Sequence, residues 1–124
     1  MDIKKAIEKI KKHPESHRIG MIASHLGIVR ESSRKGGDVV GIKVIYDKDA
    51  VESIRQKIKA MPGIVEVIVE TKDGVLDVGD EILLLAVGGD IRENVFEALM
   101  EGVNQIKKNG CRKTEIFKDT SSRI

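Results

Sequence analysis

Three cations stand where predicted strands and helices begin or end, and they are the residues best suited to chemistry. Arg30 ends a predicted strand, Arg92 opens a predicted helix, and Lys113 follows the end of that helix. Guanidinium and ammonium groups bind phosphate and carboxylate groups through charge-assisted hydrogen bonds. If the fold brings the three cations together, they form a site for an anionic ligand.

A second anion-binding signal lies at the start of the helix that contains Arg92. Gly88-Gly89 precedes Asp90, which is predicted to cap this helix, and Glu93 stands at the spacing of a capping box. Free N–H groups, the helix dipole and the arginine would then converge on an anion. A plain turn with a solvated arginine explains the same residues and is the commoner case.

The other reactive side chains give weaker signals. Cys111 is followed by Arg112, and a nearby cation can lower the pKa of a thiol and make it a nucleophile. An inert packing cysteine is the favoured interpretation, because no base is positioned beside it. His25 is expected to be an ordinary packed residue of a strand. With 1 cysteine in the chain, no intrachain disulfide or multi-thiolate metal site can form, and no metal or cofactor is predicted.

Hydrophobic periodicity predicts the elements that must position these residues. Helices are expected at residues 2–13, from Asp47 or Asp49 to Met61, and from Asp90 to Asn109-Gly110. Strands are expected at residues 18–30, 39–46, 64–69, 82–87 and 112–118, the last as an edge strand. Gly20 and Gly27 mark a bulge or a close backbone approach in the first strand. The order is α-β-β-α-β-β-α-β, in one α+β domain over residues 1–124.

Two expectations concern residues outside this regular pattern. The polar loop at residues 31–38 is predicted to be mobile, with Arg34 and Lys35 either attracting an anion or forming a solvated tip. Phe96, on the last predicted helix, is expected to join the core. Residues 119–124 form a polar tail.

Composition and charge limit the classes of function. The chain has 22 Lys+Arg against 20 Asp+Glu, and 2% of its residues are aromatic. General nucleic-acid binders use a concentrated basic face and aromatic stacking, so no nucleic-acid partner is expected. Because the first helix is rich in lysine, a nucleic-acid-binding module is kept as a minor alternative. The first residues are too charged for a secretory signal and no apolar run is long enough to cross a bilayer, which predicts a cytoplasmic protein with no membrane partner.

Four short motifs, in order along the chain, resemble those of the large catalytic subunit of molybdopterin synthase. They are Gly27-Ile-Val-Arg30, like G-x-V-R; Gly74-Val-Leu-Asp-Val-Gly-Asp-Glu81, like G-x-L-x-x-G-D-E; Arg92-Glu-Asn-Val-Phe-Glu-Ala98, like H-R-x-x-A-F-E-A; and Lys113-Thr-Glu-Ile-Phe117, like W-K-K-E-x-aromatic. Four motifs in the family's order make coincidence improbable.

The resemblance implies an α/β hammerhead fold with an added small antiparallel β subdomain, assembled as a homodimer. It also implies a small ubiquitin-like sulfur-carrier subunit docked at each end of the dimer, in a heterotetramer. The Gly-Gly tail of that subunit, carried as a thiocarboxylate, would donate sulfur to cyclic pyranopterin monophosphate and form the dithiolene of molybdopterin. The activity implied is a sulfurtransferase of molybdenum cofactor biosynthesis that needs no metal or other cofactor of its own.

The same resemblance implies roles for individual residues. Lys113 would be the catalytic lysine, which stabilises the anion that forms as sulfur is transferred. Val29, Arg30 and Arg92 would bind the pterin phosphate substrate. Ile91 stands where the family has His, and it can neither donate a hydrogen bond nor carry a proton. The alternative function is therefore a diverged, non-catalytic relative, a dimeric scaffold that binds the small subunit or a phosphorylated ligand.

Overall fold

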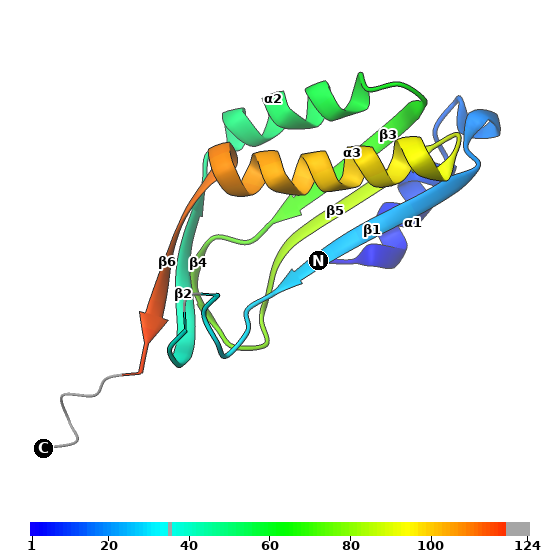
Figure 1. Cartoon of the computed structure of the whole chain (residues 1–124). Coiled ribbons are helices and arrows are strands. Elements are labelled where there is room, and N and C mark those ends of the chain that lie inside the picture. The colour runs from blue at the N-terminus through cyan, green and yellow to red at the C-terminus, as the bar shows by residue number, and fades with distance from the viewer. Residues whose placement is uncertain (35, 119–124) are drawn as a thin grey trace, which may run out of the picture.

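Two antiparallel three-stranded sheets form the framework of the protein (Figure 1). The structure, a computed structural model, describes residues 1–34 and 36–118. The larger sheet has the order β1-β5-β3, with β1 at Met21–Ile28, β5 at Glu81–Gly89 and β3 at Ile64–Thr71. The smaller sheet has the order β4-β2-β6, with β4 at Gly74–Asp77, β2 at Val39–Tyr46 and β6 at Cys111–Phe117. The α+β class predicted from the sequence is confirmed.

Helices cover both faces of the larger sheet. α1 (Ile3–Lys11) packs Ala6 and Ile10 on one face, whereas α2 (Lys48–Lys59) and α3 (Arg92–Gln105) lie side by side on the other (Figure 1). Because β5 is the central strand and is buried on both faces, its side chains are apolar in both directions, which explains the long apolar run in the sequence. None of the helices in the described part of the chain is long and apolar enough to cross a membrane.

The smaller sheet extends from one end of the larger one and shares its core. Alternate residues of β2 are buried with the helices of the larger sheet, and the hydroxyl of Tyr46 donates a hydrogen bond to the carbonyl of Ile82 at 2.9 Å. β6 follows α3 directly and pairs only with β2, so it is an edge strand, as predicted. The small sheet therefore stands beside the C-terminal end of α3 (Figure 1).

The structure has one strand more than the sequence predicts. β4 is 4 residues long and pairs with β2, where the sequence predicts a turn. The order of helices and strands is therefore α-β-β-α-β-β-β-α-β, apart from two short helical turns. β5 also continues through Gly88 and Gly89, where a break is expected, because both glycines stay paired with β1. A very short strand carries too few residues for its alternation to be recognised.

The predicted start of the last helix is wrong in detail. The N-cap residue of α3 is Ile91, which offers no side-chain hydrogen bond, so Asp90 and Glu93 form no capping box. The carboxylate of Asp90 instead accepts from the side-chain amide of Asn94 at 2.9 Å and from the N–H of Ile91 at 2.7 Å. These two hydrogen bonds lower the pKa of Asp90, whose negative charge occupies the place expected for a bound anion. The glycine-rich anion site at this helix start is therefore not formed.

Phe96 is also placed differently from the prediction. Its side chain is 54% exposed on α3, rather than part of the core. The apolar stripe of the helix is wider than the face that touches the sheet, and the core contains Val95, Ala98 and Ile106 instead. A single exposed apolar side chain of this kind is common on protein surfaces.

The two glycines marked in the first predicted strand do have special roles. The register of β1 against β5 shifts between Gly27 and Ile28, which confirms the bulge. Gly20 lies just before β1, and its N–H donates to the carbonyl of Gly89 at 2.8 Å. A Cβ on Gly20 would overlap the carbonyl oxygen of Asp90, so the two chain segments approach too closely for any side chain.

The substitution Gly20→Ala is therefore expected to lower the free energy of unfolding by about 2 kcal/mol or more, because the backbone must shift to admit the methyl group. Urea denaturation measures the loss. The matched control is Ser24→Ala, an exposed position of the same strand, which should change stability by less than about 0.5 kcal/mol. Equal stability of the two variants would contradict the close approach.

Candidate functional site

A group of cations gathers where the end of α3 meets the small sheet. Lys107 belongs to η2 (Ile106–Gly110), the π-helical turn that follows α3. Partial burial, followed by the positive charges of Lys113, Arg34 and Arg30, lowers the pKa of Lys107. These four residues come from three separate segments of the chain, and we call them the cation cluster. Such a group of like charges favours an anionic ligand.

Val29 anchors the backbone from which Arg30 projects. Its side chain is buried, its N–H donates to the carbonyl of Asp80 at 2.9 Å, and its carbonyl accepts from the N–H of Gly79 at 2.7 Å. These hydrogen bonds use the backbone N–H and the backbone carbonyl of Val29. A direct contact between Val29 and substrate therefore stays a prediction. What the structure does provide is a fixed chain position for the exposed Arg30.

The turn that carries Arg34 is tied to the small sheet. The hydroxyl of Ser33 donates to the carboxylate of Glu115 on β6 at 3.0 Å, and the N–H of Gly36 donates to the carbonyl of Ser33 at 3.1 Å. The sequence predicts a mobile polar loop at residues 31–38, and the structure shows a turn with these hydrogen bonds in that segment. Lys35, named with Arg34 in that prediction, lies outside the described residues.

Lys113 reaches the cation cluster from the inner face of the small sheet. The register of β6 against β2 places Lys113 opposite Val44, whose side chain is fully buried. Directly opposite residues of an antiparallel pair share a face of the sheet, so Lys113 points to the side of the sheet that packs on the core. Because β6 is an edge strand, the side chain stays exposed and its charge acts on Lys107.

Arg92 lies apart from the other predicted site residues. It begins α3, is exposed, and its guanidinium is 3.2 Å from the carboxylate of Glu93. α3 has 14 residues, and at about 1.5 Å per residue the helix is about 20 Å long. Lys107 stands beyond its other end (Figure 1). Within one chain, Arg30 and Lys113 both lie close enough to Lys107 to lower its pKa, whereas Arg92 is at the opposite end of α3.

Neither Cys111 nor His25 has the character of a reactive group. Burial raises the pKa of the Cys111 thiol, against the opposing effect of Lys113 and Lys107, so the nucleophile interpretation is not supported. Burial, with the charge of Lys107, lowers the pKa of His25, which is therefore a neutral packed residue of β1. Among residues 1–34 and 36–118, no three His, Cys, Asp or Glu side chains are grouped closely enough to bind a metal ion.

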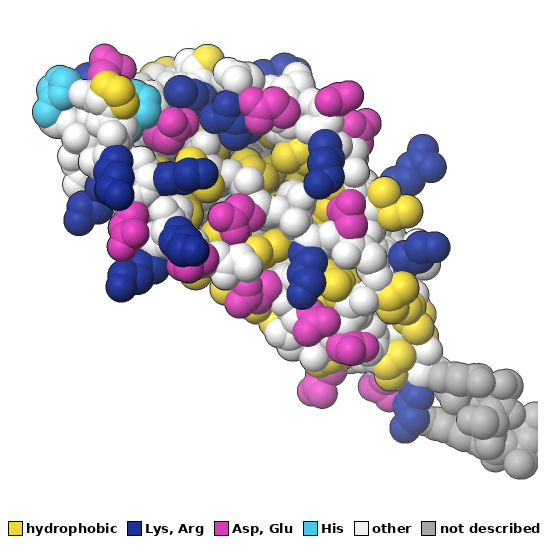
Figure 2. Space-filling view, turned by 180° about the vertical axis from the view of Figure 1, so that it is seen from behind, with side chains coloured by type: hydrophobic (Ala, Val, Ile, Leu, Met, Phe, Trp, Pro, Cys, Tyr) yellow, Lys and Arg dark blue, Asp and Glu magenta, His cyan; other side chains and the backbone are white. Residues whose placement is uncertain are grey.

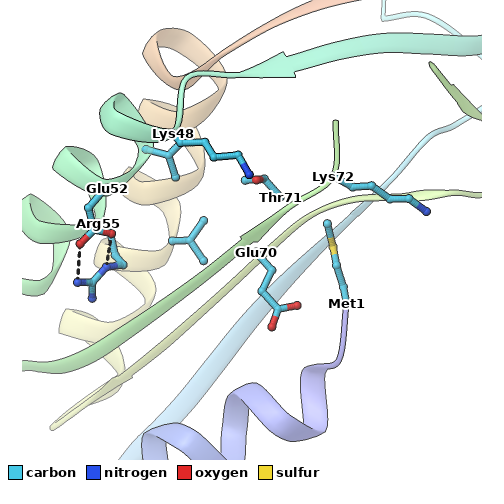
Figure 3. Close-up of a pocket in the computed structure, with 9 residues that line it drawn as sticks. Met1, Lys48, Glu52, Arg55, Glu70, Thr71 and Lys72 are labelled. Carbon is cyan, nitrogen blue, oxygen red and sulfur yellow. Dashed lines mark hydrogen bonds and ion pairs between the residues drawn. The ribbon is translucent and has the colours of Figure 1, made fainter. Parts of the chain in front are cut away.

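A hollow of about 580 Å³ lies away from the cation cluster, between α2, the end of β3 and Met1 (Figure 3). Its charged lining is partly neutralised, since the guanidinium of Arg55 is 2.8 Å from the carboxylate of Glu52. Lys48 and Lys72 stand on opposite sides of the hollow (Figure 3). None of the site residues predicted from the sequence lines it, so we do not assign the chemistry to this hollow.

Sequence reasoning misses Lys107 as a site residue. The sequence assigns it, with Lys108, only to the last turn of a helix, where cations interact favourably with the dipole. The signal that could have found it is the Asn109-Gly110 turn, which reverses the chain and returns Lys113 toward the helix end. Two lysines on either side of a tight reversal are expected to be neighbours.

Inorganic phosphate is expected to stabilise the protein, because an anion would relieve the repulsion within the cation cluster. Bound at several times its dissociation constant, it should raise Tm by about 2–5 °C relative to sodium chloride at equal ionic strength. Differential scanning fluorimetry measures the shift. Arg30→Ala and Lys113→Ala should each reduce it, and Lys57→Ala, on the exposed side of α2, should leave it unchanged. The same shift in all three variants would exclude the cluster as the phosphate site.

Comparison with known proteins identifies relatives over almost the whole chain. The family model described as MoaE protein matches residues 1–109. An uncharacterized protein of Methanocaldococcus jannaschii is 31% identical over 111 residues, which cover 85% of this chain and 90% of that protein. The family match includes Arg30, Arg92 and Lys107, whereas Lys113 lies beyond its last residue.

Solved structures share the fold. The crystal structure of molybdopterin synthase from Staphylococcus aureus matches with a TM-score of 0.77 and 21% identity, over 96% of this chain and 87% of that one. A complex of subunits 1 and 2 of molybdopterin-converting factor from Helicobacter pylori matches with a TM-score of 0.68 and 17% identity, over 94% and 80%. The resemblance drawn from four sequence motifs is thus confirmed, and the chain belongs to the MoaE family, the large subunits of molybdopterin synthase.

Proposed function

We propose that this chain is the catalytic subunit of a molybdopterin synthase, a sulfurtransferase of molybdenum cofactor biosynthesis. A small ubiquitin-like subunit would present its Gly-Gly C-terminus as a thiocarboxylate. Two such sulfurs would pass to cyclic pyranopterin monophosphate, which yields the molybdopterin dithiolene and leaves each tail as a carboxylate. The observation that carries the proposal is the cation cluster, found in a chain of the MoaE family.

The chemistry of this reaction matches the charges of the cluster. Both reactants are anions, since one carries a phosphate and the other a thiocarboxylate. Arg30 suits the phosphate, because a guanidinium can form two parallel hydrogen bonds to its oxygens. Lys113 would stabilise the oxyanion that forms at the carbonyl of the tail. Both roles require cations that are fixed before the reactants arrive.

Lys107 has a different part in the proposed mechanism. Partial burial and the neighbouring cations lower its pKa, so its amine gives up a proton more readily than that of an ordinary lysine. A group of this kind can act as a general acid or base on the oxygen that leaves the pterin. We therefore assign proton transfer to Lys107 and charge stabilisation to Lys113.

Arg92 joins this site if two copies of the chain pack along α3. The exposed face of α3 carries Phe96 and Met100, which are 54% and 68% exposed, with the partly buried Val103 on the same stripe. These positions follow the spacing of one helical face, so they suit packing against another helix. Homodimers have twofold symmetry, and a twofold axis perpendicular to α3 near Met100 would make the two helices antiparallel.

This arrangement would complete the cation cluster with a residue of the second copy. In an antiparallel pair centred near Met100, Phe96 of one copy faces Val103 of the other. By the same symmetry, Arg92 of one copy faces Lys107 of the other, because both stand about equally far from the axis. Glu93 beside Arg92 would then balance part of the added charge. The proposed assembly is thus a homodimer with two composite sites, each served by one small subunit.

Reconstitution tests the proposed function. The protein is mixed with the thiocarboxylated small ubiquitin-like subunit of its own genome and with cyclic pyranopterin monophosphate, and mass spectrometry follows the pterin that carries two sulfur atoms. Wild type should form this product, Lys113→Ala should form much less, and a small subunit with an ordinary carboxylate should give none. If wild type forms no dithiolene, or Lys113→Ala forms as much as wild type, the assignment fails.

One observation favours a second candidate, a non-catalytic dimeric scaffold. Ile91 is 53% exposed directly before Arg92, where it offers no hydrogen bond to a ligand. A scaffold of this kind would bind the small subunit or a phosphorylated ligand without turnover. Tight binding of the small subunit, together with the absence of product in the reconstitution, would favour it over the synthase.

A further inference from the structure

His25 carries a buried nitrogen that has no hydrogen-bond partner. Its Nε2 atom is shielded from solvent, and it finds no donor or acceptor among residues 1–34 and 36–118. Buried side-chain polar atoms in folded proteins are nearly always paired, because an unpaired one keeps the full cost of its lost hydration. A polar group within reach of this ring is therefore favoured to pair with Nε2.

The ring lies on the face of the larger sheet that α3 covers. His25 of β1 is directly opposite Leu85 of β5, so the two side chains share one face of the sheet. A Cβ on Gly102 of α3 would be 2.7 Å from the side chain of Leu85, which places the last turns of α3 over this part of the sheet. Figure 2 shows the opposite side of the molecule, where the visible histidine side chains lie at the end away from the small sheet. His25 is therefore beneath the end of α3, where η2 begins.

The unpaired nitrogen is directed along β1 toward the cation cluster. A Cβ on Gly27 would be 3.3 Å from Nε2 of His25, so this nitrogen faces Gly27, the next residue on the same face of the strand. The bulge follows Gly27 directly, and the chain then continues through Val29 to Arg30. The nitrogen thus points to the end of β1 that carries the phosphate-binding candidate.

The amine of Lys107 is the group best suited to pair with this nitrogen. Lys107 lies close enough for its charge, after burial, to lower the pKa of His25, and the imidazole is therefore neutral. With its proton on Nδ1, a neutral imidazole has an acceptor at Nε2, whereas an ammonium has three donors and no acceptor. Lys107 is exposed on η2, so its flexible side chain can turn from solvent to the ring. Neither residue has a carboxylate within ion-pair distance in the described part of the chain.

We propose that His25 is a positioning residue for Lys107: Nε2 of the neutral imidazole accepts a hydrogen bond from the amine and holds it within the cation cluster, on the side of Arg30. The inference rests on the proposed function, which assigns proton transfer to Lys107. The proton stays on Lys107 in this hydrogen bond, so His25 itself needs no charge. A histidine that only fills space beneath α3 is the other explanation, and substitution separates the two.

The first test measures the titration of Lys107 without turnover. His25→Phe keeps an aromatic ring and removes both nitrogens, whereas His25→Gln keeps an acceptor at about the position of Nε2. Loss of a hydrogen bond to the charged amine must lower the pKa of Lys107 in His25→Phe, and His25→Gln should keep it close to that of wild type. NMR titration of the lysine Cε signal that is absent in Lys107→Arg reports this pKa. An unchanged pKa in His25→Phe, or an equal fall in both variants, would overturn the hydrogen bond.

The second test asks whether His25 acts through Lys107. In single-turnover formation of the dithiolene product, His25→Phe should be about 10-fold slower than wild type. The double variant His25→Phe/Lys107→Ala should be no slower than Lys107→Ala alone, because the two residues act as a unit. The control is Ser24→Ala, an exposed neighbour on the same strand, which should keep the wild-type rate.

The outcomes separate the positioning role from the proposed function. Losses that multiply in the double variant would give His25 a separate effect and overturn its action through Lys107. If wild type forms no dithiolene, the proposed function fails, and the NMR comparison still decides the hydrogen bond. Circular dichroism confirms that each variant folds.

Discussion

Replacing Lys107 by alanine is expected to slow sulfur transfer by about 10²- to 10⁴-fold, the range that general acid–base groups contribute. Burial and three neighbouring cations lower the pKa of Lys107, which favours a role for its amine in proton transfer. The measurement is single-turnover formation of the dithiolene product with saturating small subunit and pterin. The loss should appear in the rate constant, because Arg30 and Lys113 still bind the anions.

Two further substitutions make this prediction specific. Lys108→Ala is the matched control, since Lys108, like Lys107, is an exposed lysine of the same turn, and its rate should stay close to that of wild type. Lys107→Arg keeps the positive charge but holds its proton at all accessible pH values. It should be nearly as slow as Lys107→Ala. Full activity of Lys107→Arg would show that only charge is needed there and would remove the proton-transfer role.

The pH dependence of the rate gives an independent readout of the same residue. Lys113 is the strongest of the charges that lower the pKa of Lys107, after burial. Removal of that charge in Lys113→Gln stabilises the protonated amine of Lys107, so its pKa must rise toward the ordinary value. The part of the pH–rate profile that reflects the titration of Lys107 should therefore shift to higher pH in this variant, even though the variant is slower than wild type. If this part of the profile does not shift, the titration belongs to a group other than Lys107.

Most of the fold follows from local patterns in the sequence. α1 and α2 were predictable because their apolar residues repeat at helical spacing, and Asp2 and Asp47 cap them through their own side chains. β2 and β5 were predictable from β-branched and unbroken apolar runs. Local patterns could not predict the features that depend on pairing between strands far apart in the sequence. β4 is a strand because β2 lies beside it, and Gly88-Gly89 stays extended because β1 pairs with it.

The site was less predictable than the fold, for a physical reason. Arg30 and Lys113 stand at element ends, which sequence reasoning can locate, and the charges of both lower the pKa of Lys107. Lys107 was missed because its significance depends on the charges around it, and those come from segments far away in the sequence. Phe96 was assigned to the core because an apolar residue at helical spacing looks the same in the sequence whether it faces the sheet or the solvent.

Mixing two impaired variants is expected to restore activity, at pterin concentrations too low to saturate Arg92→Ala, if Arg92 serves the site of the second copy. Arg92→Ala should lose about 10- to 100-fold in affinity for the pterin, because a charge-assisted contact to phosphate is removed. Lys107→Ala is slow for the reason given above. A heterodimer of the two variants contains one site with both Arg92 and Lys107 intact and one site that lacks both. The composite arrangement along α3 is the only reason for this recovery.

The size of the recovery is also predicted. When the two variants are mixed in equal amounts under conditions that exchange subunits, about half of the dimers are mixed and each has one intact site, so about a quarter of wild-type activity should return. Met100→Lys, introduced into both chains, should yield monomers in sedimentation velocity and abolish the recovery, since a lysine on the exposed stripe faces its own copy. No recovery in a mixture of intact dimers would mean that Arg92 does not act across this interface. Full activity of Arg92→Ala alone would remove Arg92 from the site, leaving the cation cluster of one chain to bind both anions.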